Sequence, residues 1–161
     1  MDPSEFKTNL DTSTKICLGY LIQKGFVTKE DLAPGWYSRF DQTDRLEANN
    51  FAAGCTFDDN GTIIITFNLN RPFDELLWAI PHESVHIAQL AKGDWDPQIG
   101  YSFWKGERYE NLSGEDENYY LNQPWEAEAK SFEDELREYL ENNVGGVKDQ
   151  YAIVRSKLEL A

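Results

Sequence analysis

Apolar side chains recur every three to four positions in four long stretches of the sequence, which is the spacing of one helix face. The first stretch ends before Gly25, a residue suited to a helix C-terminus. Pro81 interrupts the second stretch and removes one helical hydrogen bond, so we expect the helix to bend or restart there. The predicted helices cover residues 12–24, residues 73–90, a segment that starts after Pro124, and residues 147–160.

Two segments rich in β-branched and aromatic residues, 51–57 and 62–68, flank Asp58-Asp59-Asn60-Gly61. They predict an antiparallel hairpin with an Asn-Gly turn. A short helix is expected to begin at Thr28, whose hydroxyl can cap it, and to end before Pro34. Residues 93–123 have no sustained period and predict a long ordered loop or a small irregular sheet, and such long loops are usually functional. Together these elements indicate an α+β fold.

The composition limits the classes of protein and partner. A length of 161 residues fits one domain, residues 1–161, and 14% aromatic residues indicate a folded chain. The formal charge of -14 would repel phosphate backbones and anionic lipid headgroups, so neither nucleic acid nor a membrane is an expected partner. Two cysteines, the lack of a signal sequence and the lack of an apolar span predict a cytoplasmic or virion-associated protein.

The candidate chemistry lies in His82-Glu83-Ser84-Val85-His86, within the second predicted helix. Residues four apart lie one helical turn apart, so the rings of His82 and His86, the only histidines in the chain, project toward one point. This spacing suits one tetrahedral zinc ion. Glu83 lies about 100° around the helix from His82, where it can act as the general base on an activated water. One turn beyond His86, Gln89 lies on the histidine side, where it could bond a ligand or substrate, although a packing role is the favoured expectation.

The third ligand is less determined by the sequence. The metzincin extension requires glycine at position 89 and histidine at position 92, so Gln89 and Lys92 exclude that class. With no further histidine, an Asp or Glu must complete the site. Pro124-Trp125-Glu126-Ala127-Glu128-Ala129 holds the best candidates, and helix geometry does not choose between Glu126 and Glu128.

On these residues the sequence resembles the gluzincins, zinc peptidases with HExxH on one helix and a glutamate ligand, often in Glu-x-x-Ala, on a later helix. Glu126 with Ala129 matches that pattern. The sequence also looks like small gluzincin-type proteins encoded by phages, in which a Trp-x-Gly stretch, here Trp104-Lys105-Gly106, precedes Pro-Trp-Glu. The resemblance covers roughly residues 73–133. It implies a minimal zincin-like domain with a small antiparallel sheet, and a zinc site made of His82, His86 and Glu126.

The sequence departs from the gluzincin pattern at one position. Many gluzincins place Asp directly after the Ala, where it orients a ligand histidine, whereas this chain has Lys130. Glu133 or a backbone carbonyl is expected to take over that role. A donor to the oxyanion is also expected, from Arg108, Tyr109, Tyr119 or Tyr120, of which Tyr120 is our choice.

Three functions follow from these observations. The first is zinc-dependent hydrolysis of a peptide or protein substrate, with Glu83 as the base. The second is a regulatory peptidase that acts on one partner protein, like those paired with phage repressors, although the helix-turn-helix that usually accompanies them is absent. The third is a zinc-stabilised structural or virion component without turnover, for which the base at position 83 has no use.

Overall fold

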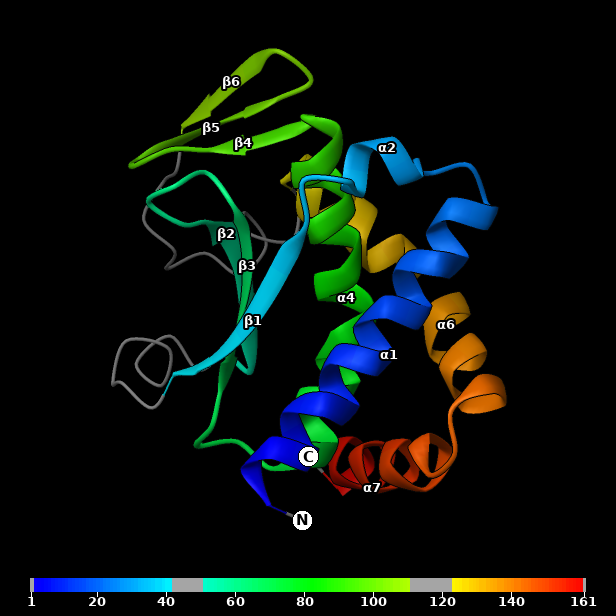
Figure 1. The fold of residues 1–161 in the computed structure, drawn as a ribbon. Helices are drawn as coiled ribbons and strands as arrows, with labels where there is room; N and C mark the ends of the chain where they lie inside the picture. Colours follow the sequence, from blue (N-terminus) through cyan, green and yellow to red (C-terminus); the bar gives the residue numbers. More distant parts are fainter. Residues whose placement is uncertain (1, 42–50, 111–122, 161) are drawn as a thin grey trace.

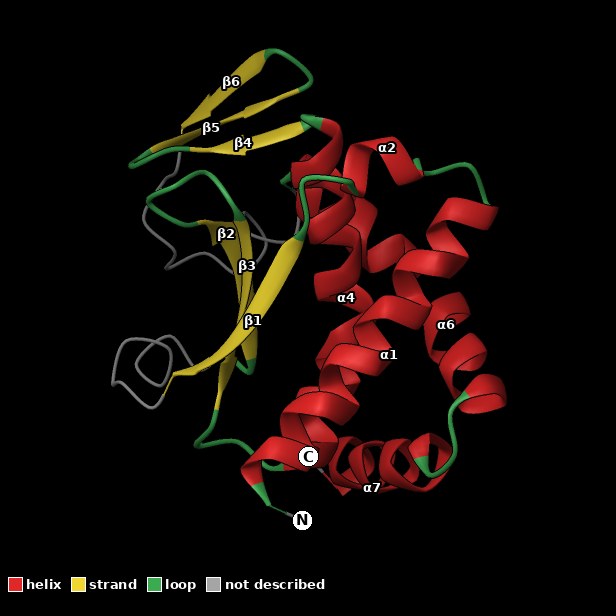
Figure 2. Ribbon diagram, in the orientation of Figure 1, coloured by secondary structure: helices red, strands yellow, loops and turns green. Residues whose placement is uncertain are grey.

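The computed structural model describes residues 2–41, 51–110 and 123–160, which form helices and two small β-sheets (Figure 2). The fold class is α+β, as predicted from the sequence. The described helices are α1 (Pro3–Gln23), α2 (Lys29–Leu32), α4 (Phe73–Lys92), α6 (Pro124–Asn143) and α7 (Val147–Leu160). The described strands are β1 (Trp36–Asp41), β2 (Ala53–Phe57), β3 (Ile63–Asn68), β4 (Trp95–Pro97), β5 (Tyr101–Trp104) and β6 (Glu107–Glu110).

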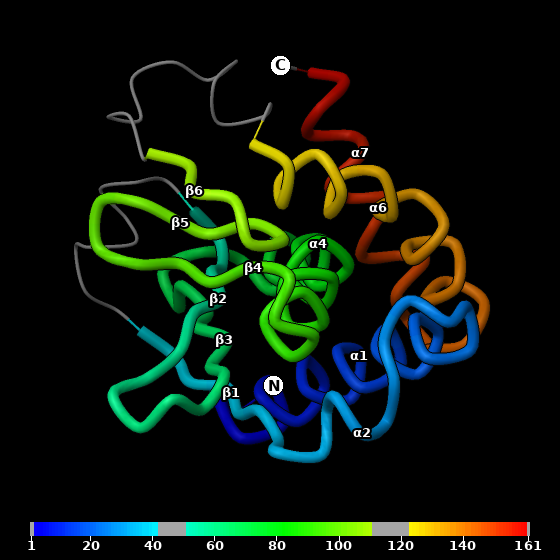
Figure 3. Tube along the Cα trace, turned by 90° about the horizontal axis from the view of Figure 1, so that it is seen from above, coloured from blue at the N-terminus to red at the C-terminus, as the bar shows by residue number. Residues whose placement is uncertain are grey.

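Helix α4 lies at the centre of the molecule (Figures 1 and 3). Strands β2 and β3 pack against one side of it, while α1, α6 and α7 cover the others. Helix α7 crosses the lower end of this arrangement, and the sheet of β4, β5 and β6 lies beside the opposite end of α4 (Figure 1). The helix that carries the HExxH motif is therefore enclosed by elements from both halves of the chain.

The first sheet has the strand order β1-β3-β2. Strands β2 and β3 pair antiparallel, which confirms the predicted hairpin. Strand β1 pairs parallel with β3, so the sheet is mixed, and the expectation of a purely antiparallel sheet is wrong for this strand. We did not predict β1, because its sequence is half polar and its partner β3 is reached only after β2. Central strand β3 is buried along its whole length.

The turn between β2 and β3 differs from the predicted type. A type I′ Asn-Gly turn needs positive φ at both central residues, but of this pair only Gly61 has one, at 79°. Asp58 organises the turn instead. Its Oδ1 accepts hydrogen bonds from the backbone N–H groups of Asn60 and Thr62, both at 2.9 Å.

The two N-terminal helices begin at side-chain caps. Helix α1 starts nine residues earlier than the predicted residue 12, because Asp2 accepts from the N–H groups of Ser4 and Glu5 and Pro3 fits the first turn. It ends as predicted before Gly25, whose φ is 76°. In α2, Thr28 and Asp31 form the reciprocal contacts of a capping box, which confirms the short helix.

Helix α4 runs unbroken from Phe73 to Lys92 and does not restart at Pro81. Proline has no N–H, so the carbonyl of Leu77, four residues earlier, lacks its helical donor. The hydroxyl of Tyr151 on α7 donates to that carbonyl at 3.0 Å, and Nη2 of Arg137 on α6 donates to the neighbouring carbonyl of Trp78 at 3.1 Å. Contacts from other helices thus compensate for the proline.

The second sheet corresponds to the small irregular sheet expected within residues 93–123. Strands β4, β5 and β6 form an antiparallel meander. Trp104 pairs with Glu107 across a two-residue turn in which Lys105 and Gly106 have φ of 49° and 84°. Two positive φ values define the tight hairpin turn that favours glycine. The Trp-x-Gly stretch therefore has a local structural reason.

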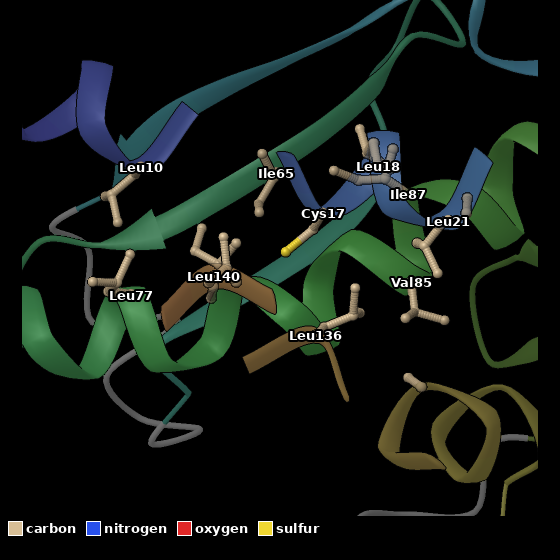
Figure 4. Packing of buried hydrophobic residues seen from close by; sticks show 14 of the residues in the cluster. Leu10, Cys17, Leu18, Leu21, Ile65, Leu77, Val85, Ile87, Leu136 and Leu140 are labelled. Atoms are coloured by element: carbon tan, nitrogen blue, oxygen red, sulfur yellow. The ribbon is translucent and has the colours of Figure 1, made fainter. Parts of the chain in front are cut away.

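The main core lies between β3, α1, α4 and α6 (Figure 4). Apolar residues of α4 on the side away from the histidines are buried there, as expected from the sequence. Each fully buried leucine or isoleucine stabilises the fold by ~1.5–3 kcal/mol relative to an exposed one. This packing fixes α4, and with it the direction of the histidine side chains. The side chains labelled in Figure 4 include Ile65, Cys17, Leu77, Val85, Ile87, Leu136 and Leu140.

Candidate metal centre

The two histidines lie one turn apart in the middle of α4 and point at the same place. Their Nε2 atoms are 3.1 Å apart, and their ring planes cross at 82°. The ring of His86 is 3% exposed, and that of His82 is less deeply buried. Both rings are held by the helix that the core packing fixes, so their convergence is a property of the backbone and not of a flexible surface.

The first turn of α6 brings a carboxylate to this point. Pro124 begins the helix and Trp125 is buried, which leaves Glu126 facing α4. Glu126 Oε2 lies 2.8 Å from His82 Nε2, and Glu126 Oε1 lies 3.1 Å from His86 Nε2. Glu128 points elsewhere and accepts a hydrogen bond from Gln89 Nε2 at 3.0 Å. Of the two candidate glutamates, Glu126 is the one that meets the histidines.

The hydrogen bonds that Nδ1 of each ring donates determine which ring nitrogen faces the centre with a lone pair. His82 Nδ1 lies 2.8 Å from Glu133 Oε1, and His86 Nδ1 lies 2.7 Å from Gln89 Oε1. The amide of Gln89 has this orientation because its Nε2 donates to the carbonyl of Trp125 and to Glu128, both at 3.0 Å. Both partners of Nδ1 are acceptors, so each Nδ1 carries hydrogen, and in a neutral ring Nε2 is the free lone pair.

This donor set fits zinc. Two imidazole lone pairs and a carboxylate converge within 2.8–3.1 Å of one another. These electron-rich groups repel one another unless a positive charge lies between them. Zinc bonds of about 2.0–2.1 Å in tetrahedral geometry separate ligand atoms by about 3.3 Å, close to the spacing found here. Nitrogen and carboxylate oxygen are zinc ligands, and three protein ligands leave a fourth position for water or substrate.

The electrostatics of the site favour positive charge at the same point. Burial lowers the pKa of His82, but the carboxylates of Glu126 and Glu133 overcome it and raise the pKa to about 10. Burial also lowers the pKa of His86, but the carboxylate of Glu126 outweighs burial, so the pKa of His86 is raised as well. Burial raises the pKa of Glu126, but both rings outweigh it and lower the value to about 2. The attraction that holds protons on these rings also holds a cation.

Glu83 is buried beside the histidines, with 7% of its surface exposed. Its Oε2 has no hydrogen-bond partner. Burial raises its pKa, which the neighbouring rings of His86 and His82 partly offset. One potential metal-binding atom from each of His82, Glu83 and His86 lies within 4.8 Å of the other two. In the described part of the chain, this is the one group of three or more His, Cys, Asp or Glu residues with that property. A buried carboxylate oxygen without a donor needs an explanation, and an activated water would provide one.

Several residues around the histidines were missed by the sequence-based prediction or given another role in it. Gln89, for which packing is the favoured expectation, accepts a hydrogen bond from His86 Nδ1. Trp95 lies 4.8 Å from the His86 ring and stacks on Trp125. Glu133, one of two options for orienting a histidine, contacts His82. The spacing of Gln89 from His86 was visible in the sequence, whereas nothing in the sequence indicated Trp95.

The predicted oxyanion donors are not brought to the histidines by any described contact. Tyr120, our choice, and Tyr119 lie outside the described residues. Arg108 pairs with Glu110 and lies over the ring of Tyr101. Tyr109 packs edge-on against Trp125, 5.7 Å between ring centroids.

A cavity of about 500 Å³ opens next to His82 and Glu83. This volume is within the range of ligand pockets. Its lining comes from α4, α6, α7 and the segment that leads into β2. The lining residues are Phe51, Ala52, Ala53, Trp78, Ala79, His82, Glu83, Glu133, Arg137 and Leu158.

Comparison with protein-family models, with curated proteins and with solved structures finds no match to this chain. Within the described residues, no helix combines the length and the apolar character needed to cross a lipid bilayer. The function of the protein is therefore inferred from the geometry of the site.

Proposed function

We propose that this protein is a zinc-dependent peptide hydrolase of the gluzincin type. His82, His86 and Glu126 hold the metal, and Glu83 is the general base. The observation that carries the proposal is the buried, unpartnered Oε2 of Glu83 next to two imidazole lone pairs and a carboxylate that face one point. Structural zinc sites have four protein ligands, whereas the three ligands proposed here leave a position for a water that Glu83 can deprotonate.

The mechanism assigns a task to each side chain. When bound, zinc supplies Lewis acidity that lowers the pKa of water to about 7 and polarises the scissile carbonyl. Glu83 accepts the proton of the attacking water at Oε2 and then passes it to the leaving amine nitrogen. Burial raises its pKa above the ordinary value, which favours the uptake of a proton.

Two further side chains orient the histidine rings. Glu133 and Gln89 hold His82 and His86 in the tautomer that presents Nε2. Arg137 Nη1 lies 3.4 Å from Glu133 and stabilises its negative charge. These contacts do what an Asp after Ala129 does in many gluzincins, at the position where this chain has Lys130.

An edge strand next to the cavity supports a peptide as substrate. Strand β2 is last in the order β1-β3-β2 of the described sheet, and its first residue, Ala53, lines the cavity with His82 and Glu83. An edge strand offers unpaired backbone N–H and C=O groups, to which an extended peptide can add as a further strand. The carbonyl of such a peptide would then lie near the metal centre.

The deciding experiment is Glu83→Gln in zinc-loaded protein. We expect one zinc per chain to be retained, since Glu83 is not a proposed ligand, and peptide cleavage to fall by about 10²–10⁴-fold. Zinc is measured by atomic absorption and cleavage by mass spectrometry with a randomised peptide library. Glu75→Gln, on the same helix and paired with Arg71, is the matched control and should cleave like the wild type. Full activity of Glu83→Gln would contradict the proposal.

A further inference from the structure

The cavity beside the metal centre has two different sides. Its polar side consists of His82, Glu83, Glu133 and Arg137. Its other side is apolar and comes from three separate segments of the chain. The apolar residues are Phe51, Ala52, Ala53, Trp78, Ala79 and Leu158.

The charged groups on the polar side are largely engaged with one another. Glu133 binds His82 through one oxygen and Arg137 through the other. The guanidinium of Arg137 lies 3.7 Å from the centroid of the Trp78 ring and donates to the Trp78 carbonyl, and its Nε is buried without a hydrogen-bond partner. A substrate side chain in the cavity therefore meets charges that are mostly paired within the protein, and the unpartnered Arg137 Nε is buried. Glu83 Oε2 is unpartnered, but the proposed catalysis uses it.

The rim of the cavity exposes large apolar side chains. Phe51 is 42% exposed and Leu158 is 60% exposed. Leu158 lines the cavity together with His82, and its neighbour Lys157 pairs with Asp74 in the first turn of α4 at 2.9 Å. Exposed apolar side chains around a concave apolar wall are typical of a surface that buries an apolar ligand.

We propose that this cavity binds the side chain of a large apolar residue, aromatic or leucine-like, next to the scissile bond, and that Leu158 determines this specificity. The inference rests on the proposed hydrolase function, because only a hydrolase has a scissile bond next to which the side chain can lie. The volume of about 500 Å³ accommodates a large side chain. Burying apolar surface against Trp78, Ala79 and Leu158 supplies the affinity. Charged residues would lose hydration without gaining a partner.

The test separates binding from cleavage. Zinc-loaded Glu83→Gln protein is titrated by calorimetry with five peptides that carry Phe, Leu, Ala, Asp or Lys at one position. The rest of the peptide is a sequence that the wild type cleaves. If the wild type cleaves none, a sequence enriched by binding from the randomised library is used. We expect Phe and Leu peptides to bind at least tenfold more tightly than Asp or Lys peptides. In the wild type, cleavage should occur next to the varied residue with the same order of preference.

Two variants test the walls. Leu158→Ser should weaken binding of the Phe peptide about fivefold and leave the Ala peptide within twofold, because only a large side chain reaches the rim. Leu160→Ser, also on α7, 89% exposed and outside the cavity lining, is the matched control. Ala79→Leu fills part of the cavity and should make the Ala peptide bind better than the Phe peptide.

The possible results discriminate between the two proposals. If the Glu83→Gln protein shows the expected preference but the wild type cleaves nothing, hydrolysis is refuted and the cavity stands as an apolar peptide-binding site. If the wild type cleaves peptides without preferring Phe or Leu, hydrolysis stands and the specificity inference is overturned. The specificity inference is also overturned if Leu158→Ser and Leu160→Ser behave alike.

Discussion

At the scale of single residues, the centre depends on the direction in which each polar side chain points. Glu126 and Glu128 are two residues apart in the first turns of α6, yet one contacts both histidine Nε2 atoms and the other accepts from Gln89. Their charges and positions in the sequence are nearly equivalent. Their predicted roles differ, and substituting each glutamate in turn distinguishes the metal ligand from the hydrogen-bond acceptor.

The first prediction compares Glu126→Gln with Glu128→Gln. Glu126→Gln removes an anionic ligand, so we expect zinc affinity to fall by more than about 100-fold. Loss of a residue that only hydrogen-bonds a ligand usually costs about 10–100-fold. Glu128→Gln keeps an amide oxygen that can accept from Gln89, and its affinity should fall by about tenfold or less. Competition with a chromophoric chelator measures both. Equal losses in the two variants would mean that Glu126 is not the ligand.

The second prediction concerns Gln89. Gln89→Leu removes the acceptor of His86 Nδ1, so the tautomer of His86 is no longer fixed, and it also removes the side-chain donor to the Trp125 carbonyl. We expect zinc affinity to fall about 10–100-fold, the range for a lost orienting partner. Gln98→Leu, on an exposed turn, serves as the control. An unchanged affinity in Gln89→Leu would reduce Gln89 to the packing role expected from the sequence.

At the scale of elements, local signals in the sequence account for most of the helices. Thr28 and Pro124 each stand at a helix start, and the periodic apolar residues of α4, α6 and α7 predict their extents. Strand β1 was not predictable in this way, since parallel pairing with β3 depends on contacts distant in sequence. The early start of α1 was readable from the cap at Asp2-Pro3 and was missed.

Pro81 shows how tertiary contacts can override a local signal. The proline predicts a break, but α4 continues because Tyr151 and Arg137 donate to carbonyls of the preceding turn. This turn lies directly before His82, so its integrity affects how the first histidine is presented. The hydrogen bond of Tyr151 is buried and links α7 to α4.

The third prediction tests that link with a double-mutant cycle. Tyr151→Phe leaves the Leu77 carbonyl without a donor and should destabilise the fold by ~1–3 kcal/mol. Pro81→Ala restores the helical N–H that Leu77 lacks, so Tyr151→Phe should have a smaller effect, by ~1 kcal/mol, in that background. Urea denaturation gives the free energies of unfolding, and Tyr37→Phe, which removes an exposed hydrogen bond to Asp58, is the control for loss of a tyrosine hydroxyl. Additive effects would show that the tyrosine does not replace the missing donor.

At the scale of the whole molecule, the site joins parts of the chain that the sequence keeps apart. The HExxH motif alone predicted two histidines on one helix face, and the structure has them there. The approach of α6 to α4 could not be derived from periodicity, because Glu126 and Glu128 flank the same apolar stripe. It follows from burial of Trp125 and Ala129 and from the second sheet, whose Trp95 packs between α4 and α6.

Because the proposed ligands come from α4 and α6, zinc should stabilise the whole fold, and its effect should depend on pH. In chelated protein the raised pKa of His82, about 10 against 6.5, contributes stability that is full below pH 6.5 and is lost as pH rises toward 10. The lowered pKa of Glu126, about 2, contributes stability above pH 4.5 that is lost as pH falls. Chelated protein should therefore lose thermal stability between about pH 6.5 and 9.

Zinc reverses this trend, since it binds the deprotonated rings and competes with the protons that the carboxylates attract. The fourth prediction is that the zinc-induced rise in Tm increases from about pH 6 to pH 9, reaching the equivalent of ~4 kcal/mol where free zinc is about 1,000 times its Kd. Calorimetry with EDTA or buffered zinc measures it, and Glu126→Gln should reduce the rise at every pH. A rise that is equal at both ends of this range, or larger at the acidic end, would mean that the two histidines do not ligate the metal through their neutral forms.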